Sequence, residues 1–144
     1  VTNAPNIGSL FRIADAFGIE KLILCGENIQ IGRKMAKTSR ATEKVVNFEI
    51  CNSASTVVEM LKTKDYQIIS LEISDSSKPI NTIQFSIKKP IALIIGDENF
   101  GVSEAILKLS EEIIHINMFG QNSSMNVVQA TNIALYEITK QLQY

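Results

Sequence analysis

Short apolar runs and helical patterns alternate along this chain. Nearly continuous Ile, Leu and Val predict strands covered on both faces, at Lys21–Cys25, Val45–Ile50, Tyr66–Leu71, Ile91–Ile95 and Ile113–Asn117. Apolar positions at helical spacing predict helices at Ile7–Phe17, Arg33–Lys37, Ser55–Lys62, Ser103–Lys108 and Asn126–Gln141. This alternation predicts an α/β fold with a mostly parallel sheet flanked by helices.

The last predicted helix carries a broad apolar stripe, from Val127 to Ile138, which is typical of burial against a sheet or a partner subunit. The segment Ser74–Ile87, with Pro79 and several serines, is predicted to be a long surface connection. No linker or repeat divides the 144 residues, so we expect a single domain spanning 1–144. The chain opens in what reads as a loop, which leaves room for a first strand upstream of Val1.

Composition and charge exclude several classes of protein. No apolar run approaches the roughly 20 residues that cross a bilayer, and no signal-like segment is visible, so we expect a cytoplasmic protein without membrane contact. Cys25 and Cys51 are far apart and are interpreted as reduced, small apolar side chains. With a single histidine, His115, inside an apolar run, we expect no metal site and interpret His115 as a structural or partly exposed strand residue.

The net charge of −1 argues against a molecule that is basic overall. Basic residues nevertheless gather within residues 33–44, opposed only by Glu43; they are Arg33, Lys34, Lys37, Arg40 and Lys44. This basic segment is either a solvated helix face or a patch that contacts nucleic-acid phosphates.

The first of three polar islands is Asn3–Arg12. Asn6 can cap the helix that follows, and Pro5 favours an extended entry into it. Gly8 in the first turn is unfavourable for a helix, which indicates that another segment packs closely there. Arg12 is either solvent-exposed or ion-paired, or it offers a guanidinium to phosphate or to developing negative charge.

The second and third islands follow buried strands. Residues 96–103 lie between a strand and a helix, where open α/β sheets bind ligands. They match neither a dinucleotide fingerprint nor a P-loop, and Glu98 is either a helix-capping carboxylate or a site residue. Residues 121–130 crowd polar groups at the start of the last helix, whose first turn offers unpaired N–H donors to a ligand. Together the islands predict one composite site.

Taken in order, the islands resemble the three motifs of the SpoU (TrmH-like) branch of the SPOUT RNA methyltransferases. The matching residues are Asn6, Gly8 and Arg12; Gly96, Glu98 and Gly101; and Ile116, Met118 and Ser124–Val127. The resemblance covers nearly the whole chain. Its main departure is Met125, where the family usually has Leu, a residue of similar volume.

This resemblance implies a homodimeric α/β protein with a deep C-terminal trefoil knot, which is a rare exception to un-knotted topology. It also implies that S-adenosylmethionine binds in the knot. The residues that match or flank the family's cofactor contacts are Leu71, Glu72, Gly96, Ile116, Met118 and Met125.

The implied reaction transfers a methyl group from S-adenosylmethionine to a ribose 2′-hydroxyl of tRNA or rRNA. The polar positions associated with the active site are Asn6, Arg12, Glu98, Ser124 and Asn126. Arg12 would position the target phosphate or accept the hydroxyl proton, Ser124 and Asn126 would supply neutral hydrogen bonds, and Glu98 would support the loop. The basic segment would then bind RNA through Arg33, Lys34, Lys37 and Arg40.

Two other functions remain open. One is a non-catalytic RNA-binding or assembly dimer that retains the fold; such a relative would be expected to lose Arg12, Ser124 or Asn126, and all three are present. The other is a nucleotide-binding α/β enzyme of different chemistry, against which the missing phosphate-binding loop argues.

Overall fold

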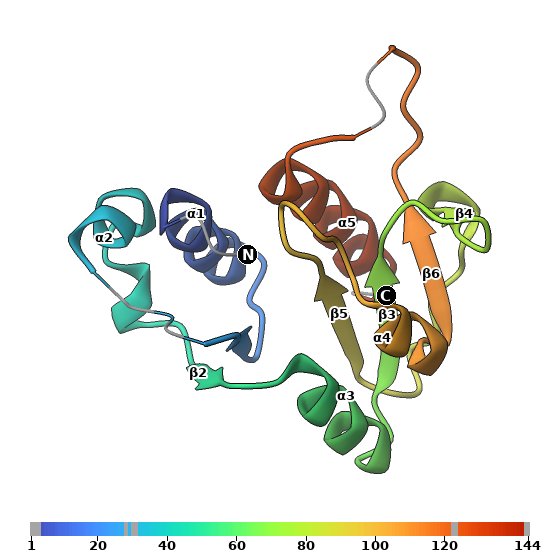
Figure 1. The fold of residues 1–144 in the computed structure, drawn as a ribbon, viewed down its shortest axis with the longest axis horizontal. Coiled ribbons are helices and arrows are strands. Elements are labelled where there is room, and N and C mark those ends of the chain that lie inside the picture. Colours follow the sequence, from blue (N-terminus) through green and yellow to red (C-terminus); the bar gives the residue numbers. More distant parts are fainter. Residues whose placement is uncertain (1–3, 28, 30–31, 122–123, 143–144) are drawn as a thin grey trace. The chain divides into compact units, whose positions relative to one another are not determined.

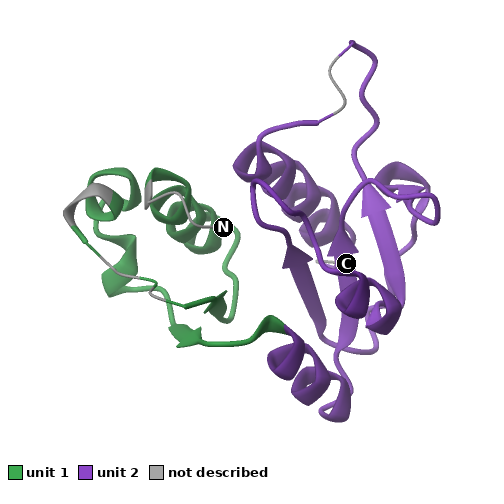
Figure 2. Ribbon diagram, viewed as in Figure 1, with its two compact units in different colours: residues 1–54 green, residues 55–144 purple. Residues whose placement is uncertain are grey.

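A computed structural model describes residues 4–27, 29, 32–121 and 124–142, with the side chains of residues 4, 33 and 34 outside the described part (Figure 1). The chain forms two compact units, residues 1–54 and 55–144, and each is described by itself (Figure 2). All strand pairs in the described residues run parallel. The predicted α/β class with parallel strands and flanking helices is therefore confirmed.

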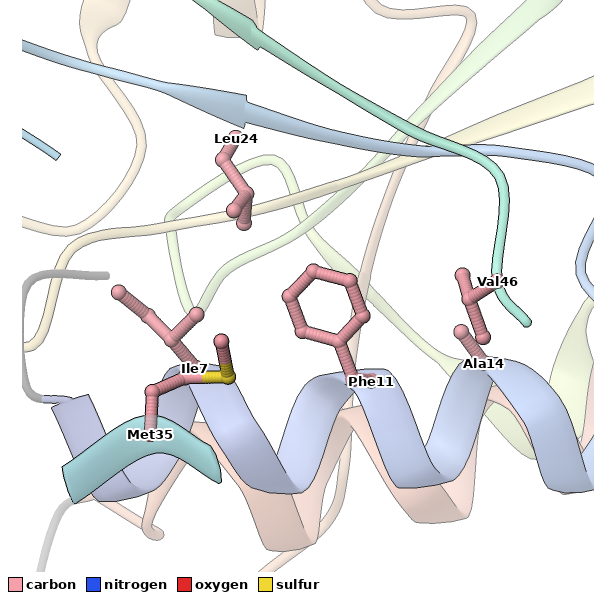
Figure 3. Close-up of a cluster of buried hydrophobic side chains, with 6 residues drawn as sticks. All are labelled: Ile7, Phe11, Ala14, Leu24, Met35 and Val46. Carbon is pink, nitrogen blue, oxygen red and sulfur yellow. The ribbon is translucent and has the colours of Figure 1, made fainter. Parts of the chain in front are cut away.

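The first unit packs helices against a two-stranded sheet. Its elements are α1 (Ala4–Ala16), β1 (Leu22–Cys25), α2 (Arg33–Ser39), the short 3-10 helix η1 (Thr42–Lys44) and β2 (Phe48–Cys51). Figure 3 shows the buried core, in which one face of α1 points towards β1; its residues are Ile7, Phe11, Ala14, Leu24, Met35 and Val46. The ring of Phe11 also meets Phe48 edge-to-face, with the centroids 5.0 Å apart.

Gly8 lies where α1 and α2 approach each other. A methyl group at Gly8 would overlap the Thr38 hydroxyl and the Met35 carbonyl oxygen of α2. Because only a residue without a side chain fits this contact, the predicted close packing at Gly8 is confirmed.

The strands of the first unit end on a pair of cysteines. Cys25 and Cys51 are register partners in the parallel pair β1–β2, and both are free thiols. Burial raises the pKa of the Cys25 thiol. Both side chains are half-buried, in agreement with their interpretation as small apolar residues.

The second unit is a four-stranded parallel sheet with the strand order β4-β6-β3-β5. Its elements are α3 (Ala54–Thr63), β3 (Gln67–Leu71), β4 (Lys78–Pro79), the 3-10 helix η2 (Ile80–Thr82), β5 (Ile91–Ile95), α4 (Glu104–Leu109), β6 (Glu112–His115) and α5 (Val127–Leu142). The central strand β3 is fully buried at Ile68, Ile69 and Ser70, as its continuous apolar sequence predicts. Ala134 and Ile138 of α5 join the same core. The other residues of the predicted stripe are half-buried, except Ile133, which is 43% exposed.

The predicted strand Val45–Ile50 is wrong at its start. The backbone N–H groups of Val45 and Val46 both bond to the Thr42 carbonyl oxygen and close a turn, so they cannot join a ladder. Strand β2 therefore begins only at Phe48, and Val45 is left 72% exposed. The predicted strand Ile113–Asn117 likewise ends two residues early, at His115.

The segment Ser74–Ile87 is not merely a surface connection. It contains β4 and η2, and it buries Ile80 and Phe85 in the core of the second unit. The Gln141 side chain of α5 accepts a hydrogen bond from Phe85 N at 2.9 Å and donates one to the Ile83 carbonyl oxygen at 3.0 Å. These bonds satisfy the Phe85 N–H and the Ile83 carbonyl oxygen, which lie in a segment that the sequence predicted to face solvent.

The start of α1 also differs from the prediction. The helix is already formed at Ala4, so Asn6 lies within its first turn and is not its cap. Pro5 is likewise helical and does not provide an extended entry. A first helical turn tolerates proline because its N–H groups have no helical acceptor.

Candidate functional site

A cavity of about 420 Å³ opens at the carboxyl ends of the strands of the second unit. In the register of the sheet, Leu71 at the end of β3 is paired with Ile95 on one side and Ile114 on the other. Residues that follow these three strands therefore meet at one edge, as in other open α/β sheets. The first turn of α5 completes the lining with Val127 and Ala130.

Nine of the residues predicted for the site from sequence line this cavity. The six residues predicted to contact cofactor are all present: Leu71, Glu72, Gly96, Ile116, Met118 and Met125. Three of the five predicted catalytic residues accompany them: Glu98, Ser124 and Asn126. The second unit thus brings together residues that are far apart in the sequence.

The loop between β5 and α4 has a tight, specific backbone. Asp97 and Gly101 exchange two backbone hydrogen bonds, of 3.2 and 2.9 Å. A Cβ atom at Gly96 would come within 2.7 Å of the Gly101 Cα and 2.8 Å of the Val102 nitrogen. Gly101 itself has a φ of +67°, which favours glycine. Both glycines of this motif are therefore required by the shape of the loop.

Glu72 holds that loop from the end of β3. One carboxylate oxygen accepts the Val102 N–H at 2.8 Å, and the other accepts the Ile73 N–H at 3.1 Å. A side chain at Gly101 would overlap this carboxylate. Glu72 lines the cavity as predicted, but its carboxylate is engaged in supporting the cavity wall, a role that the sequence did not indicate.

Glu98 is exposed and does not cap a helix. The N-cap of α4 is Ser103, whose hydroxyl accepts the Ile106 N–H at 3.4 Å. The helix-capping interpretation of Glu98 is therefore wrong, and its carboxylate stands on the loop at the cavity.

His115 ends β6 and was missed as a cavity residue. Its Nδ1 lies 2.8 Å from the Ser77 hydroxyl and its Nε2 lies 3.1 Å from Asn117 Oδ1. These two hydrogen bonds fix the half-buried ring, which confirms its interpretation as a structural or partly exposed strand residue. The sequence signal that could have found it is its position, because it directly precedes the first residue of the third motif, Ile116.

Asn126 caps helix α5. Its side-chain Oδ1 accepts the Val128 N–H at 2.8 Å and, more weakly, the Gln129 N–H at 3.4 Å. Two of the N–H donors predicted to serve a ligand are thus already paired within the chain. The amide NH₂ group of Asn126 and the exposed hydroxyl of Ser124 are polar groups at the cavity that a ligand can use.

Asn6 and Arg12 belong to the first unit, whereas the described residues that line the cavity belong to the second. Arg12 is exposed on α1, and Asn6 is half-buried in its first turn. Neighbouring positions on the same helix, Phe11 and Ala14, face the core. The guanidinium of Arg12 is consequently available to a partner and is not needed for the packing of α1.

The basic segment is partly described. The side chains of Arg33 and Lys34 lie outside the described part, and those of Lys37 and Arg40 are exposed. The one opposing acid, Glu43, accepts a hydrogen bond from the Ser39 hydroxyl, and this bond holds the Glu43 pKa below its ordinary value.

The described residues contain no group of three or more His, Cys, Asp or Glu that could hold a metal ion. None of the helices within them is long and apolar enough to cross a membrane.

The sequence model of the SpoU rRNA Methylase family matches residues 1–136. The chain belongs to this family. The matched range includes all three polar islands, and residues of the second and third islands line the cavity, among them Gly96, Glu98 and Ser124–Val127.

Two curated relatives of this SpoU-family chain show how far the similarity extends. The tRNA (guanosine(18)-2'-O)-methyltransferase of Escherichia coli K12 is 27% identical over 138 residues, which are 96% of this chain and 59% of that enzyme. The 23S rRNA (guanosine-2'-O-)-methyltransferase RlmB of Blochmanniella floridana is 26% identical over 145 residues, which are 100% of this chain and 56% of that enzyme. The chain thus spans less than two thirds of the length of these relatives.

Solved structures of the family share the fold. The TrmH/SpoU tRNA modifying enzyme of A. aeolicus superposes with a TM-score of 0.87 at 28% identity, covering 99% of this chain and 72% of that one. AviRb of Streptomyces viridochromogenes, solved in complex with the cofactor AdoMet, gives a TM-score of 0.85 at 25% identity, covering 97% and 56%. The SpoU resemblance of the sequence is therefore confirmed for family and fold.

Proposed function

We propose that this chain is a methyltransferase domain that binds S-adenosylmethionine in the 420 Å³ cavity and methylates a ribose 2′-hydroxyl of RNA. The observation that carries the proposal is the convergence of six expected cofactor contacts on one cavity in a chain of the SpoU family. The E. coli and Blochmanniella relatives are named as 2'-O-methyltransferases, and AviRb was solved with AdoMet. These names support the reaction and the cofactor.

The residues present fit this cofactor. Small-molecule sites are typically cavities of about 300–1,000 Å³ with mainly apolar walls and a few polar groups. Leu71, Ile116 and Met125 supply apolar side chains that suit the adenine ring. Gly96 lines the same cavity, and its lack of a side chain lets the Gly101 backbone pack against it. When bound, S-adenosylmethionine supplies an electrophilic methyl group on a sulfonium. The chain has to hold the acceptor hydroxyl in line with that group, and positioning of this kind can account for much of a rate enhancement.

The polar residues would bind and orient the RNA at the cavity. Ser124 and the amide of Asn126 would orient the acceptor nucleotide through neutral hydrogen bonds, while Glu98 would support the loop at the cavity. Arg12 would bind the phosphate beside the target or take up the proton that the 2′-hydroxyl loses. Asn6 would hold the segment around Arg12. The family match supports this division because it spans both the α1 segment and the cavity segments.

The RNA partner would be tRNA or rRNA. Relatives with both kinds of substrate in their names match nearly the whole chain. The exposed Lys37 and Arg40, together with Arg33 and Lys34, would contact the RNA backbone. Because the net charge of the chain is −1, we expect this affinity to be modest and sensitive to salt.

We further propose a homodimer in which the two units act as one catalytic domain. Helix α5 leaves Ile133 and Tyr136 exposed, at 43% and 62%, which suits an interface with a second copy. The trefoil knot stays a prediction from the family resemblance. A cytoplasmic location and a reaction without metal likewise stay predictions, made from the sequence.

The experiment is methyl transfer from labelled S-adenosylmethionine to unmodified tRNA and rRNA fractions, followed by nuclease digestion to locate the label. We expect the label on a ribose 2′-oxygen, and the labelled fraction identifies the substrate class. Label on a base would contradict the proposed reaction. Cofactor binding without any transfer would favour the non-catalytic RNA-binding dimer.

An Arg12→Ala variant tests the proposed role of Arg12 in the same assay. We expect it to lose transfer while cofactor affinity stays nearly unchanged, because Arg12 is exposed and not part of the core. The matched control is Lys64→Ala, which removes an exposed positive charge after α3. Full activity of Arg12→Ala would remove Arg12 from the mechanism.

A further inference from the structure

The two most exposed large apolar side chains in the described residues are both phenylalanines beside the cavity. Phe100 is 89% exposed and Phe119 is 94% exposed. Phe100 stands between Glu98 and Gly101, which line the cavity, and Phe119 directly follows Met118, which also lines it. Neither phenylalanine lines the cavity itself. The two rings therefore belong to the rim segments and not to the wall.

Phe100 is presented by a well-defined backbone. The carboxylate of Asp97 accepts the N–H groups of Asn99 at 3.0 Å and Phe100 at 3.1 Å, and the Asp97–Gly101 bridge closes the loop. The chain thus fixes the point from which an apolar ring projects into solvent. The segment that carries Phe119 follows β6 and extends beyond the carboxyl ends of the strands (Figure 1). Each ring is almost fully exposed and adds little burial to the fold, whereas an aromatic ring buries a large apolar area when a partner covers it.

The charge of the rim argues for the kind of partner. Residues 96–103 and 116–126 contain no Lys or Arg, and they include the carboxylates of Asp97 and Glu98. A phosphate group would be repelled here. An unpaired nucleobase suits the rim better, because it is uncharged, has two flat faces and stacks on aromatic side chains.

We propose that Phe100 and Phe119 stack on unpaired bases of the RNA that presents its ribose to the cavity. The proposal rests on the proposed function and narrows its substrate to RNA whose target region is single-stranded, since a base inside a duplex is already stacked on its neighbours. Stacking at the rim would hold bases next to the target, while the basic segment would hold the backbone.

Fluorescence can test this directly because the chain contains no tryptophan. Phe119→Trp and Phe100→Trp each introduce a single fluorophore at the rim. We expect a single-stranded RNA of about 12 nucleotides, matching the site sizes of stacking proteins, to quench this emission. The same strand annealed to its complement should not. The control is Ile87→Trp, at an exposed apolar position of the same unit that is 67% exposed and does not line the cavity.

Affinity for the same single strand separates stacking from simple apolar contact. Phe100→Ala and Phe119→Ala are each expected to weaken binding about 5- to 150-fold, the range for loss of one stacked base. Tyr at either position should retain binding, whereas Leu should not. Equal binding by the Leu and Tyr variants, or quenching of the Ile87→Trp control to the same extent, would overturn the proposal. So would an emission change that depends on protein concentration without RNA, because a second copy of the chain would then cover the rings.

These results are separable from the proposed reaction. If the wild-type chain methylates RNA and both Ala variants keep its kcat/KM, the stacking proposal fails and the proposed function stands. If no RNA fraction is methylated but single strands quench the rim tryptophans, stacking stands and the proposed function fails.

Discussion

The carboxylate of Glu72, at the end of β3, accepts the backbone N–H of Val102 across 2.8 Å. These residues are 30 positions apart, and Val102 is buried where the β5–α4 loop turns towards α4. The bond joins two walls of the proposed cofactor cavity. The shape of that cavity therefore depends on a side chain that need not contact the cofactor through its charge.

Replacing Glu72 tests this support. In Glu72→Ala the Val102 N–H loses its acceptor, and an unsatisfied buried donor costs about 1–3 kcal/mol. We expect faster hydrogen exchange at the Val102 amide and weaker binding of S-adenosylmethionine, whereas Glu72→Gln, which retains an acceptor oxygen, should preserve most of both. Glu59→Ala on α3 is the control for removal of an exposed carboxylate. Unchanged exchange at Val102 in Glu72→Ala would show that the bond does not hold the loop.

Asn126 is expected to affect stability and catalysis separately. Its Oδ1 caps α5, so Asn126→Ala should lower the free energy of unfolding by about 1 kcal/mol. Asn126→Asp keeps the capping oxygen and adds negative charge at a helix N-terminus, so its stability should match or exceed that of the wild type. The Asp variant lacks the amide donor, and we expect it to lose methyl transfer. Urea denaturation and the transfer assay measure the two effects, and an active Asp variant would exclude the amide from the mechanism.

Gly8→Ala should destabilise the chain although alanine is the better helix former. The new methyl group would overlap the Met35 carbonyl and the Thr38 side chain, and overpacking of this kind typically costs about 1–3 kcal/mol. The gain in helix propensity of about 0.5–1 kcal/mol does not offset it. The control is Gly120→Ala, where a Cβ atom would meet nothing within 4 Å. Thermal unfolding shows whether Gly8→Ala raises or lowers Tm. An increase in Tm would contradict close packing of α1 on α2.

Glu111 is expected to contribute to the decrease in the free energy of unfolding at acid pH. Burial raises its pKa, but hydrogen bonds from the Ile68 N–H and the Lys62 ammonium outweigh this, and the pKa lies below its ordinary value of about 4.5. A carboxyl group with a lowered pKa stabilises the fold above its unfolded pKa, and this contribution is lost as the pH falls through the folded value. Glu111→Gln should therefore flatten the loss of stability between about pH 5 and 3. If the unfolding free energies of the wild type and of Glu111→Gln fall in parallel over this pH range, Glu111 does not contribute to the loss of stability.

The sequence predicted the fold class because continuous apolar strands imply a parallel sheet. Local pattern also placed residues 96–103 after a strand, where such sheets bind ligands, whereas the expected cofactor contacts, such as Ile116, came from the family resemblance. The sequence did not predict the bond between Glu72 and Val102 or the bond between His115 and Ser77, since these join residues 30 and 38 positions apart and leave no periodic signal. The predicted start of β2 was wrong because of a local interaction. The N–H groups of Val45 and Val46 bond to the Thr42 carbonyl oxygen in a turn, so they do not form the strand hydrogen bonds that the apolar run predicted.

The placement of the cofactor can be measured with the four methionines of the chain. Met118 and Met125 line the cavity, whereas Met35 is buried in the first unit and Met60 lies on α3. With ¹³C-methyl-labelled methionine, assigned by single Met→Leu variants, an NMR titration with S-adenosylmethionine should shift the Met118 and Met125 signals and leave those of Met35 and Met60 in place. Signals of Met118 and Met125 that do not move at saturating S-adenosylmethionine would contradict a cofactor site in this cavity.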